Sequence, residues 1–397
     1  MQTVEINAAV LRWARETAGL SLEEAADRLK ISSARGLSAV DRLKALEDGQ
    51  KLPTRPLLIR MSKQYRRPLL VFYLDAPPRK GDRGEDFRRL PQDYDVSNEG
   101  LVDALVRDVR ARQSIVRAVL EDEDEATPLP FVSSAAIGDG VSGLAEKIRK
   151  GIGFDLNTFR EQKGVGEAFT FLRGKVEATG VFVLLIGDLG SHHSTIPVDA
   201  FRGFALADEV APFVIINDQD SRAAWSFTLL HEVAHVWLGR TGISGALAET
   251  TLERFCNDVA GTLLLPPAEL RDIHVRDGVP LALAIERINA FAIDRNISRA
   301  MVAYRLYRAG SIEMPMWSAL RAEFRKQWLD NRDRQRELAR DQEGGPTYYI
   351  VRRHRIGKAL VELISRMTAS GALTFTKASK VLGVKPRNVP EFLQPTA

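Results

Sequence analysis

Residues 226–240, SFTLLHEVAHVWLGR, form the stretch that decides the fold of this chain. Apolar residues recur along it at helical spacing, and no Pro or Gly interrupts them before Gly239, so a helix of about four turns is expected. His231 and His235 have the i, i+4 spacing that places both side chains on one face of a helix. With Glu232 beside them they complete an HExxH motif, which predicts a metal ion held by two imidazoles and a carboxylate that can take a proton from water. A surface His pair is the alternative, but it does not account for the apolar flanks.

A catalytic zinc ion held by two His needs a third protein ligand and an open position for water. Residues 252–266, LERFCNDVAGTLLLP, have helical periodicity and offer Glu253, which we predict as the third ligand. Glu249, in the less regular segment GALAET, is the alternative ligand. Asn257 follows Glu253 by one helical turn and could orient a ligand, or could be a surface amide. Cys256 has apolar neighbours and is expected to be a small buried side chain rather than a ligand or nucleophile.

The loop GSHHST places His192 and His193 together, and a peptidase needs a hydrogen-bond donor for its tetrahedral oxyanion. A solvent-exposed loop without a catalytic role is the interpretation that we favour for this pair.

Composition and charge restrict the class of protein. With one cysteine, Cys256, no internal disulfide can form, which is typical of the cytoplasm and supports a cytoplasmic location. The first residues lack a signal-peptide core, and apolar runs such as residues 181–186 are too short to cross a membrane. Residues 1–90 carry 18 Lys or Arg against 12 Asp or Glu, while the whole chain has a net charge of +4. This asymmetry suits a nucleic-acid contact near the N-terminus, or a solvated basic surface.

The N-terminal region has the pattern of short helices joined by tight turns. Helices are expected at residues 6–19, at 21–30 with a capping box of Ser21 and Glu24, at 39–49 and at 55–65. This arrangement is typical of a helix-turn-helix bundle.

Four segments of the N-terminal region, GLSLEEAADRLKIS, LKALEDGQKLPT, YRRPLLVFYLDAPP and DFRRLP, resemble XRE-type helix-turn-helix regulators fused to ImmA/IrrE-type zinc metallopeptidases. The Exx(A/C)N run of that family, followed by LLxP, matches Glu253, Cys256, Asn257 and residues 263–266. The resemblance implies that Glu253 completes the zinc site. It also implies binding to operator DNA by the N-terminal domain.

The chain departs from this family at SSARGLSAVDR, where several extra residues fall at the expected base contacts. The candidate DNA contacts here are Ser32, Ser33, Arg35 and Arg42. Lys30 and Lys44 are candidates for contacts to phosphates. The alternative is a bundle that only mediates partner binding or dimerisation, as in a homodimer.

Strands are expected at residues 181–187, 201–206 and 213–217, the last within PFVIIND just before the metal helix. This last strand is predicted to form a wall of the cleft, to which an extended peptide adds as a further strand. Beyond residue 280 the chain is again helical. A basic stretch with interleaved aromatic residues, 321–358, is interpreted as a charged helix face rather than a nucleic-acid site.

The predicted fold class is α+β, mostly helical, with a helix-turn-helix bundle, a zincin-like core with a small sheet, and a helical C-terminal region. The expected boundaries are residues 1–77 for the helix-turn-helix domain, 78–130 for a linker and long helix, 131–275 for the peptidase core and 276–397 for the C-terminal region. The predicted protein is a DNA-binding regulator whose zinc endopeptidase domain cleaves a repressor or other regulatory protein. The alternative is a transcriptional regulator and antitoxin that neutralises a small, PIN-like toxin encoded beside it and keeps the peptidase fold as a scaffold.

Overall fold

The computed structural model describes residues 6–34, 36–78, 85–86, 97–191, 194–244, 251–340 and 347–394. The chain divides into two compact units. Unit 1 contains Met1–Arg83, Pro91–Val109 and Asp188–Ala200, and unit 2 contains Gly84–Leu90, Arg110–Gly187 and Phe201–Ala397. Among the described residues, no helix combines the length and the hydrophobicity needed to cross a membrane.

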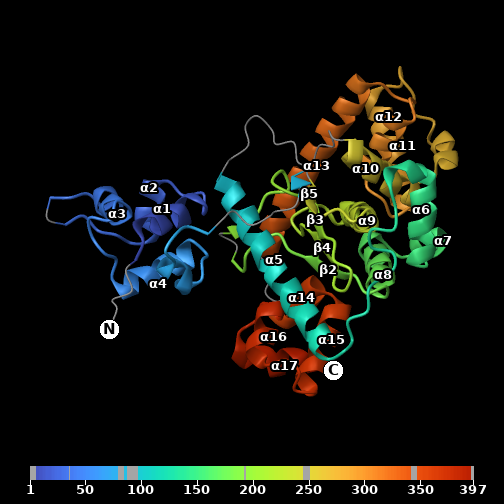
Figure 1. The fold of residues 1–397 in the computed structure, drawn as a ribbon. Coiled ribbons are helices and arrows are strands. Elements are labelled where there is room, and N and C mark those ends of the chain that lie inside the picture. Colours follow the sequence, from blue (N-terminus) through green and yellow to red (C-terminus); the bar gives the residue numbers. More distant parts are fainter. Residues whose placement is uncertain are drawn as a thin grey trace. The chain divides into compact units, whose positions relative to one another are not determined.

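Unit 1 is built from short helices around a small apolar core. Its helices are α1 (Ala8–Glu16), α2 (Leu22–Arg28), α3 (Ala39–Glu47), α4 (Arg55–Gln64) and η1 (Leu69–Tyr73), with the first part of α5 (Ser97–Asp122) (Figure 1). The capping box of Ser21 and Glu24 predicted from the sequence begins α2, and a second one, of Ser38 and Asp41, begins α3. A buried ion pair joins α1 to α3, since Arg15 Nε lies 2.8 Å from Glu47 Oε1.

Unit 2 contains a five-stranded mixed sheet in the order β1-β5-β3-β4-β2. Its strands are β1 (Glu85–Asp86), β2 (Phe182–Leu185), β3 (Gly203–Leu206), β4 (Phe213–Ile216) and β5 (Gly242–Ser244). Strand β3 is antiparallel to both β4 and β5, whereas β2 is parallel to β4 and β1 is parallel to β5. The three strands predicted from apolar runs are present as β2, β3 and β4.

Helices cover this sheet and form most of unit 2. In chain order after α5, the first of them are η2 (Ile137–Asp139), α6 (Gly140–Gly151), α7 (Leu156–Arg160), α8 (Val165–Glu177), α9 (Arg222–Trp237), α10 (Thr251–Leu264) and η4 (Pro267–Ile273). Those that follow are α11 (Leu281–Asp294), α12 (Arg299–Arg308), α13 (Met314–Arg340), α14 (Tyr348–Ile356), α15 (Lys358–Ala369), α16 (Phe375–Leu382), η5 (Pro386–Asn388) and α17 (Val389–Leu393). The predicted class, α+β and mostly helical, is therefore confirmed.

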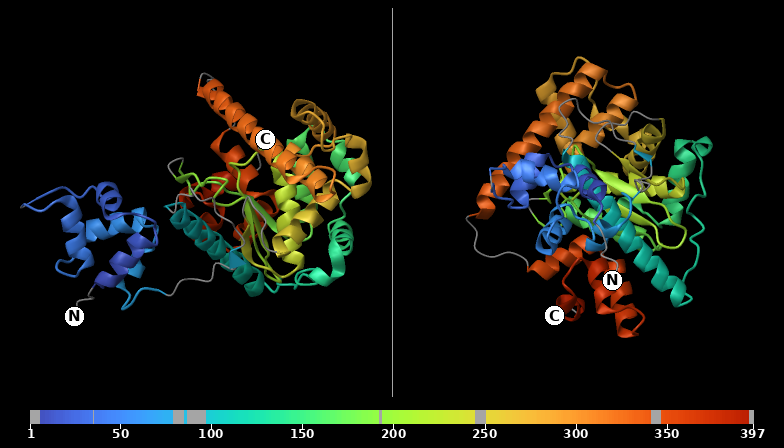
Figure 2. Two further views of the ribbon diagram at one scale, coloured as in Figure 1. Left: turned by 90° about the horizontal axis from the view of Figure 1, so that it is seen from above. Right: turned by 60° about the vertical axis from the view of Figure 1, so that its left-hand side comes forward.

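The core of unit 2 lies between the sheet and helices α8, α9 and α10. Helix α9 packs on β3 and β4, and α8 and α10 pack against α9 (Figure 1). Figure 2 shows α13 as one long helix at the margin of this unit. Since α9 is buried over almost its whole length, the polar side chains that it carries are held by packing on every side.

Candidate metal centre

Helix α9 holds the two histidines of the HExxH motif inside the core. It is the helix predicted from residues 226–240, but it begins earlier, at Arg222, and ends at Trp237. His231 is 5% exposed and His235 is 1% exposed, so both imidazoles are removed from bulk water. Their Nε2 atoms lie 3.1 Å apart. Two imidazoles in this arrangement present their ring nitrogens to one common point.

Helix α10 brings Glu253 to the same point. Its Oε1 lies 3.0 Å from Nε2 of His235, and its Oε2 lies 3.3 Å from Nε2 of His231. Glu253 is 1% exposed. One ligand atom from each of the three residues lies within 4.8 Å of the other two. We call these three residues the metal cluster, because two imidazoles and one carboxylate are a donor set of catalytic zinc sites.

The electrostatics of the metal cluster favour a positive charge at its centre. Burial lowers the pKa of His231, but the negative charge of Glu253 and its hydrogen bond outweigh this effect and raise the pKa overall. Burial also disfavours the charged form of Glu253, yet the neighbouring His231 and His235 lower its pKa below the usual range. A buried carboxylate that stays ionised needs a cation beside it. The observed donor set therefore fits a bound metal ion.

Two further side chains contact His231. The Ser244 hydroxyl, at the end of β5, lies 3.2 Å from Nε2 of His231 and is buried. Asn257, on α10, forms a side-chain hydrogen bond with His231 that raises the pKa of the histidine. Asn257 was singled out by its spacing from Glu253. Ser244 was not, because the sequence around a three-residue strand contains no pattern that places it near the HExxH helix.

Glu232 lies against the sheet, on the side of α9 that contacts β3. Its side chain is 0% exposed. A Cβ atom added to Gly203 of β3 would lie 2.7 Å from Glu232 Oε1 and 2.8 Å from Thr228 Cγ2. The absence of a side chain at Gly203 therefore makes the space that Glu232 occupies. Burial raises the pKa of Glu232, and the charge of His231 opposes this shift while that of Glu253 adds to it.

Four other residues were considered from the sequence as possible ligands or catalytic groups. Cys256 is a free and fully buried thiol, and burial raises its pKa well above the usual range. Glu249, the alternative third ligand, lies outside the described residues, and so do His192 and His193.

The predicted wall of the cleft needs correction. Strand β4 pairs with β2 on one side and with β3 on the other, so its main-chain groups are already used by the sheet. An extended peptide cannot add to a strand with two neighbours, because no free edge remains. A run of four buried apolar residues indicates a strand inside the core, but it does not identify the strand's neighbours.

The predicted DNA contacts lie in unit 1, between α2 and α3 and on α3. Lys30, Ser32 and Ser33 are exposed in the connection between the two helices, and Lys44 is exposed on α3. Arg42 donates a hydrogen bond to the main-chain oxygen of Ser32, so this side chain braces the connection. Arg35 lies outside the described residues.

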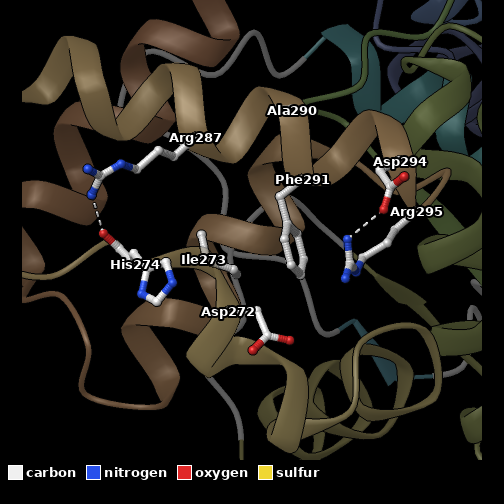
Figure 3. A pocket seen from close by; sticks show the side chains of 8 residues that line it. All are labelled: Asp272, Ile273, His274, Arg287, Ala290, Phe291, Asp294 and Arg295. Atoms are coloured by element: carbon white, nitrogen blue, oxygen red, sulfur yellow. Dashed lines mark hydrogen bonds and ion pairs between the residues drawn. The ribbon is translucent and has the colours of Figure 1, made fainter.

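A surface hollow of about 520 Å³ shares no lining residue with the metal cluster. Figure 3 shows Phe291 in its middle, with Arg287 near one end and Arg295 near the other. Arg287 donates to the main-chain oxygen of His274, and Arg295 pairs with Asp294 at 2.8 Å and with Glu269 at 3.1 Å. Both guanidinium groups are engaged within the protein, so the hollow does not present a free arginine to an anion.

Residues 189–307 match the model of one protein family, Peptidase_M78, described as the IrrE N-terminal-like domain. An ImmA/IrrE-type peptidase domain is present. The match contains His231, Glu232, His235, Glu253 and Ser244, and it ends within α12. No curated protein matches the chain, and no solved structure matches it. The helices α1 to α4 lie outside the matched residues.

Proposed function

We propose that this protein is a zinc-dependent endopeptidase. The observation that carries the proposal is the convergence of His231, His235 and Glu253 on one buried point, within a segment similar to a peptidase family. These three residues would hold the ion. Zinc bound there would lower the pKa of a water molecule and polarise the carbonyl of the scissile peptide bond.

Glu232 has the position of a general base in this proposal. It is adjacent to His231 in the chain and is fixed between α9 and Gly203 of β3. Its carboxylate would accept a proton from the attacking water and deliver it to the leaving amine. Asn257 would help to hold the His231 ring beside the ion, and the Ser244 hydroxyl, 3.2 Å from Nε2, would lie next to the bound ion.

Metal analysis of purified variants tests the zinc site. His231→Ala is expected to lose zinc, whereas His274→Ala, outside the metal cluster, should keep the wild-type content. Glu232→Gln should keep zinc and lose hydrolysis, because only the proton acceptor is removed. Equal zinc content in His231→Ala and the wild-type protein contradicts the proposal.

We propose that unit 1 binds DNA, and its charge distribution supports this. Between Asp48 and Asp75 the chain has six Lys or Arg and no acidic residue. Arg55, Arg60 and Lys63 are exposed along one side of α4, and Lys51 is exposed just before it. In contrast, Asp41 is exposed on α3, and Asp48 is exposed directly after it. We therefore expect α4 to supply phosphate contacts.

A gel shift with the promoter of the protein's own gene tests DNA binding. Replacing Arg55, Arg60 and Lys63 by Gln is expected to weaken binding. It should also flatten the salt dependence, by roughly 0.9 in the log–log slope for each phosphate that the protein no longer neutralises. The matched control replaces Lys377, Lys380 and Lys385 of the C-terminal region by Gln. No shift with the wild-type protein would favour a unit 1 that only docks a protein target.

The physiological target that we propose is a repressor or another regulatory protein, whose cleavage would release the genes that it controls. The competing role is that of an antitoxin, in which the metal centre is a scaffold. Two results together would support the antitoxin role. The Glu232→Gln variant would still regulate the genes that the protein controls, and the neighbouring gene would encode a small nuclease.

A further inference from the structure

The hydroxyl of Ser244 is a further polar group at the metal cluster. Its oxygen lies 3.2 Å from Nε2 of His231, and Ser244 is 3% exposed. Within the metal cluster, the Nε2 atoms of the two histidines are 3.1 Å apart, and the Glu253 oxygens lie 3.0 and 3.3 Å from them. The Ser244 hydroxyl therefore lies as close to His231 as the ligand atoms lie to one another.

This separation is the one expected between two ligands of the same zinc ion. Zinc binds nitrogen and oxygen ligands at about 2.0–2.1 Å in a tetrahedral arrangement, so its ligand atoms are roughly 3.3 Å apart. A hydrogen bond between the hydroxyl and the imidazole accounts for a similar distance. The second neighbour of the hydroxyl therefore decides which interpretation is favoured.

The second neighbour of the Ser244 hydroxyl is Glu232. The hydroxyl is close enough to the Glu232 carboxyl group to lower its pKa by hydrogen bonding. Ser244 also pairs with Gly203 across the β3–β5 ladder, and Gly203 makes the space for Glu232. In the proposed mechanism the attacking water lies between the ion and Glu232. A hydroxyl between a ligand nitrogen and the base lies in the place expected for that water.

We propose that the Ser244 hydroxyl is the fourth ligand of the metal ion in the resting protein, and that it turns away before water can bind. The proposal rests on the proposed peptidase function, because it concerns the same ion. Four protein ligands close a zinc site, whereas a catalytic site keeps one position open. Hydrolysis would then be held back until the hydroxyl is displaced.

The Ser244 hydroxyl can turn away without a change in the sheet. The main-chain oxygen of Ser244 accepts a hydrogen bond from the amide of Arg202 at 3.2 Å, and the residue is paired in the β3–β5 ladder. These contacts hold the main chain, whereas the side chain has three staggered positions about its Cα–Cβ bond. A neutral hydroxyl is not among the usual protein ligands of zinc, which are thiolate, imidazole and carboxylate. It is therefore the ligand that water can replace most easily.

Cobalt(II) in place of zinc tests this ligation without any hydrolysis. Ser244→Cys puts a sulfur atom where the hydroxyl lies, and a thiolate bound to cobalt(II) gives an intense charge-transfer band in the near ultraviolet. The matched control is Ser226→Cys, which places a thiol at another buried position, on α9. We expect the band in Ser244→Cys and not in the wild-type protein or the control. All three proteins contain Cys256, so its contribution is the same in each.

Ser244→Ala provides a second measurement, which remains valid if Ser244→Cys does not fold. The probe is acetohydroxamate, which binds an open metal position, and its affinity is followed by the visible spectrum of the cobalt(II) protein. If the hydroxyl closes the site in about nine molecules of ten, its removal should tighten acetohydroxamate binding about tenfold, because only the open form binds the probe. Ser226→Ala should bind the probe like the wild-type protein.

Two results would each overturn the proposal. One is a folded Ser244→Cys that binds cobalt(II) without the charge-transfer band. The other is a Ser244→Ala that binds acetohydroxamate no more tightly than the wild-type protein, as expected for a hydroxyl that only forms hydrogen bonds beside the ion. Wild-type protein that binds neither zinc nor cobalt(II) would instead contradict the proposed metal centre, and the ligation with it.

Discussion

Glu253 Oε1 lies 3.0 Å from Nε2 of His235, although the two residues belong to different helices. Helix α10 packs directly on α9, and both residues are almost completely buried. A carboxylate and two imidazoles buried together without solvent are stabilised when they share a cation. The contact between α9 and α10 therefore completes a site for which α9 alone has only two ligands.

Replacing Glu253 by Ala is expected to weaken zinc binding by more than roughly 100-fold, because even a partner that only orients a ligand contributes roughly 10- to 100-fold. The dissociation constant is measured by competition with a chromogenic chelator. Glu249→Ala is the informative control, since Glu249 was the alternative ligand, and it should bind zinc like the wild-type protein. A large loss in Glu249→Ala with none in Glu253→Ala would reverse the assignment.

Gly203→Ala tests the contact between β3 and Glu232. The new methyl group would lie 2.7 Å from Glu232 Oε1 and 2.8 Å from Thr228 Cγ2. We expect the free energy of unfolding to fall by about 1–3 kcal/mol, which is typical of an overpacked core. Zinc should remain bound while hydrolysis falls, because the displaced group is the base and not a ligand. Gly174→Ala in α8, where the new methyl group meets no atom within 4 Å, should not be destabilised.

Arg173→Met tests how the C-terminal helices are held to the core of unit 2. Arg173 Nε lies 3.1 Å from Glu177 Oε1, and the same guanidinium donates to main-chain oxygens of Val183 and His354. Loss of the arginine leaves the Glu177 charge buried without its partner, which is expected to cost about 3–5 kcal/mol in urea unfolding.

The control for Arg173→Met is Arg149→Met, which removes a similar pair, with Glu146, from an exposed helix surface. That substitution should leave the unfolding midpoint nearly unchanged, because exposed ion pairs contribute little. Equal effects of the two substitutions would show that the Arg173 pair does not hold the C-terminal helices.

Asp208→Asn should reveal a pH-dependent contribution to stability. Burial raises the pKa of Asp208, but the amides of Ala211 and Val210 and the Arg117 guanidinium outweigh it and lower the pKa overall. A carboxyl group whose pKa is lower in the folded state contributes stability above its ordinary pKa and loses it as the pH falls through the folded value.

The wild-type protein should therefore be more stable than Asp208→Asn by roughly 1 kcal/mol at neutral pH. The difference should disappear in acid, below the ordinary aspartate range. Thermal unfolding followed by circular dichroism across this pH range measures both, and a difference that is constant with pH would contradict the assignment.

Part of the fold followed from local patterns in the chain. Apolar runs predicted β2, β3 and β4, and helical spacing predicted α9 and α10, because the periodicity of buried residues reflects the local backbone conformation. Strands β1 and β5 were not expected, since two and three residues respectively leave no such pattern. The role assigned to β4 was wrong, because the order of strands depends on hydrogen bonds between segments distant in the sequence.

The sequence by itself determined which residues can form a metal site: His231 and His235 at i, i+4 spacing, Glu232 beside them, and Glu253 on a later helix. Only the tertiary structure decided that Ser244 and Gly203 belong to the same site, and that β5 lies beside it, paired with β3. The physical reason is the range of the interactions involved. Spacing on one helix is set by the geometry of its backbone, whereas packing between strands and helices is set by contacts that exist only in the folded chain.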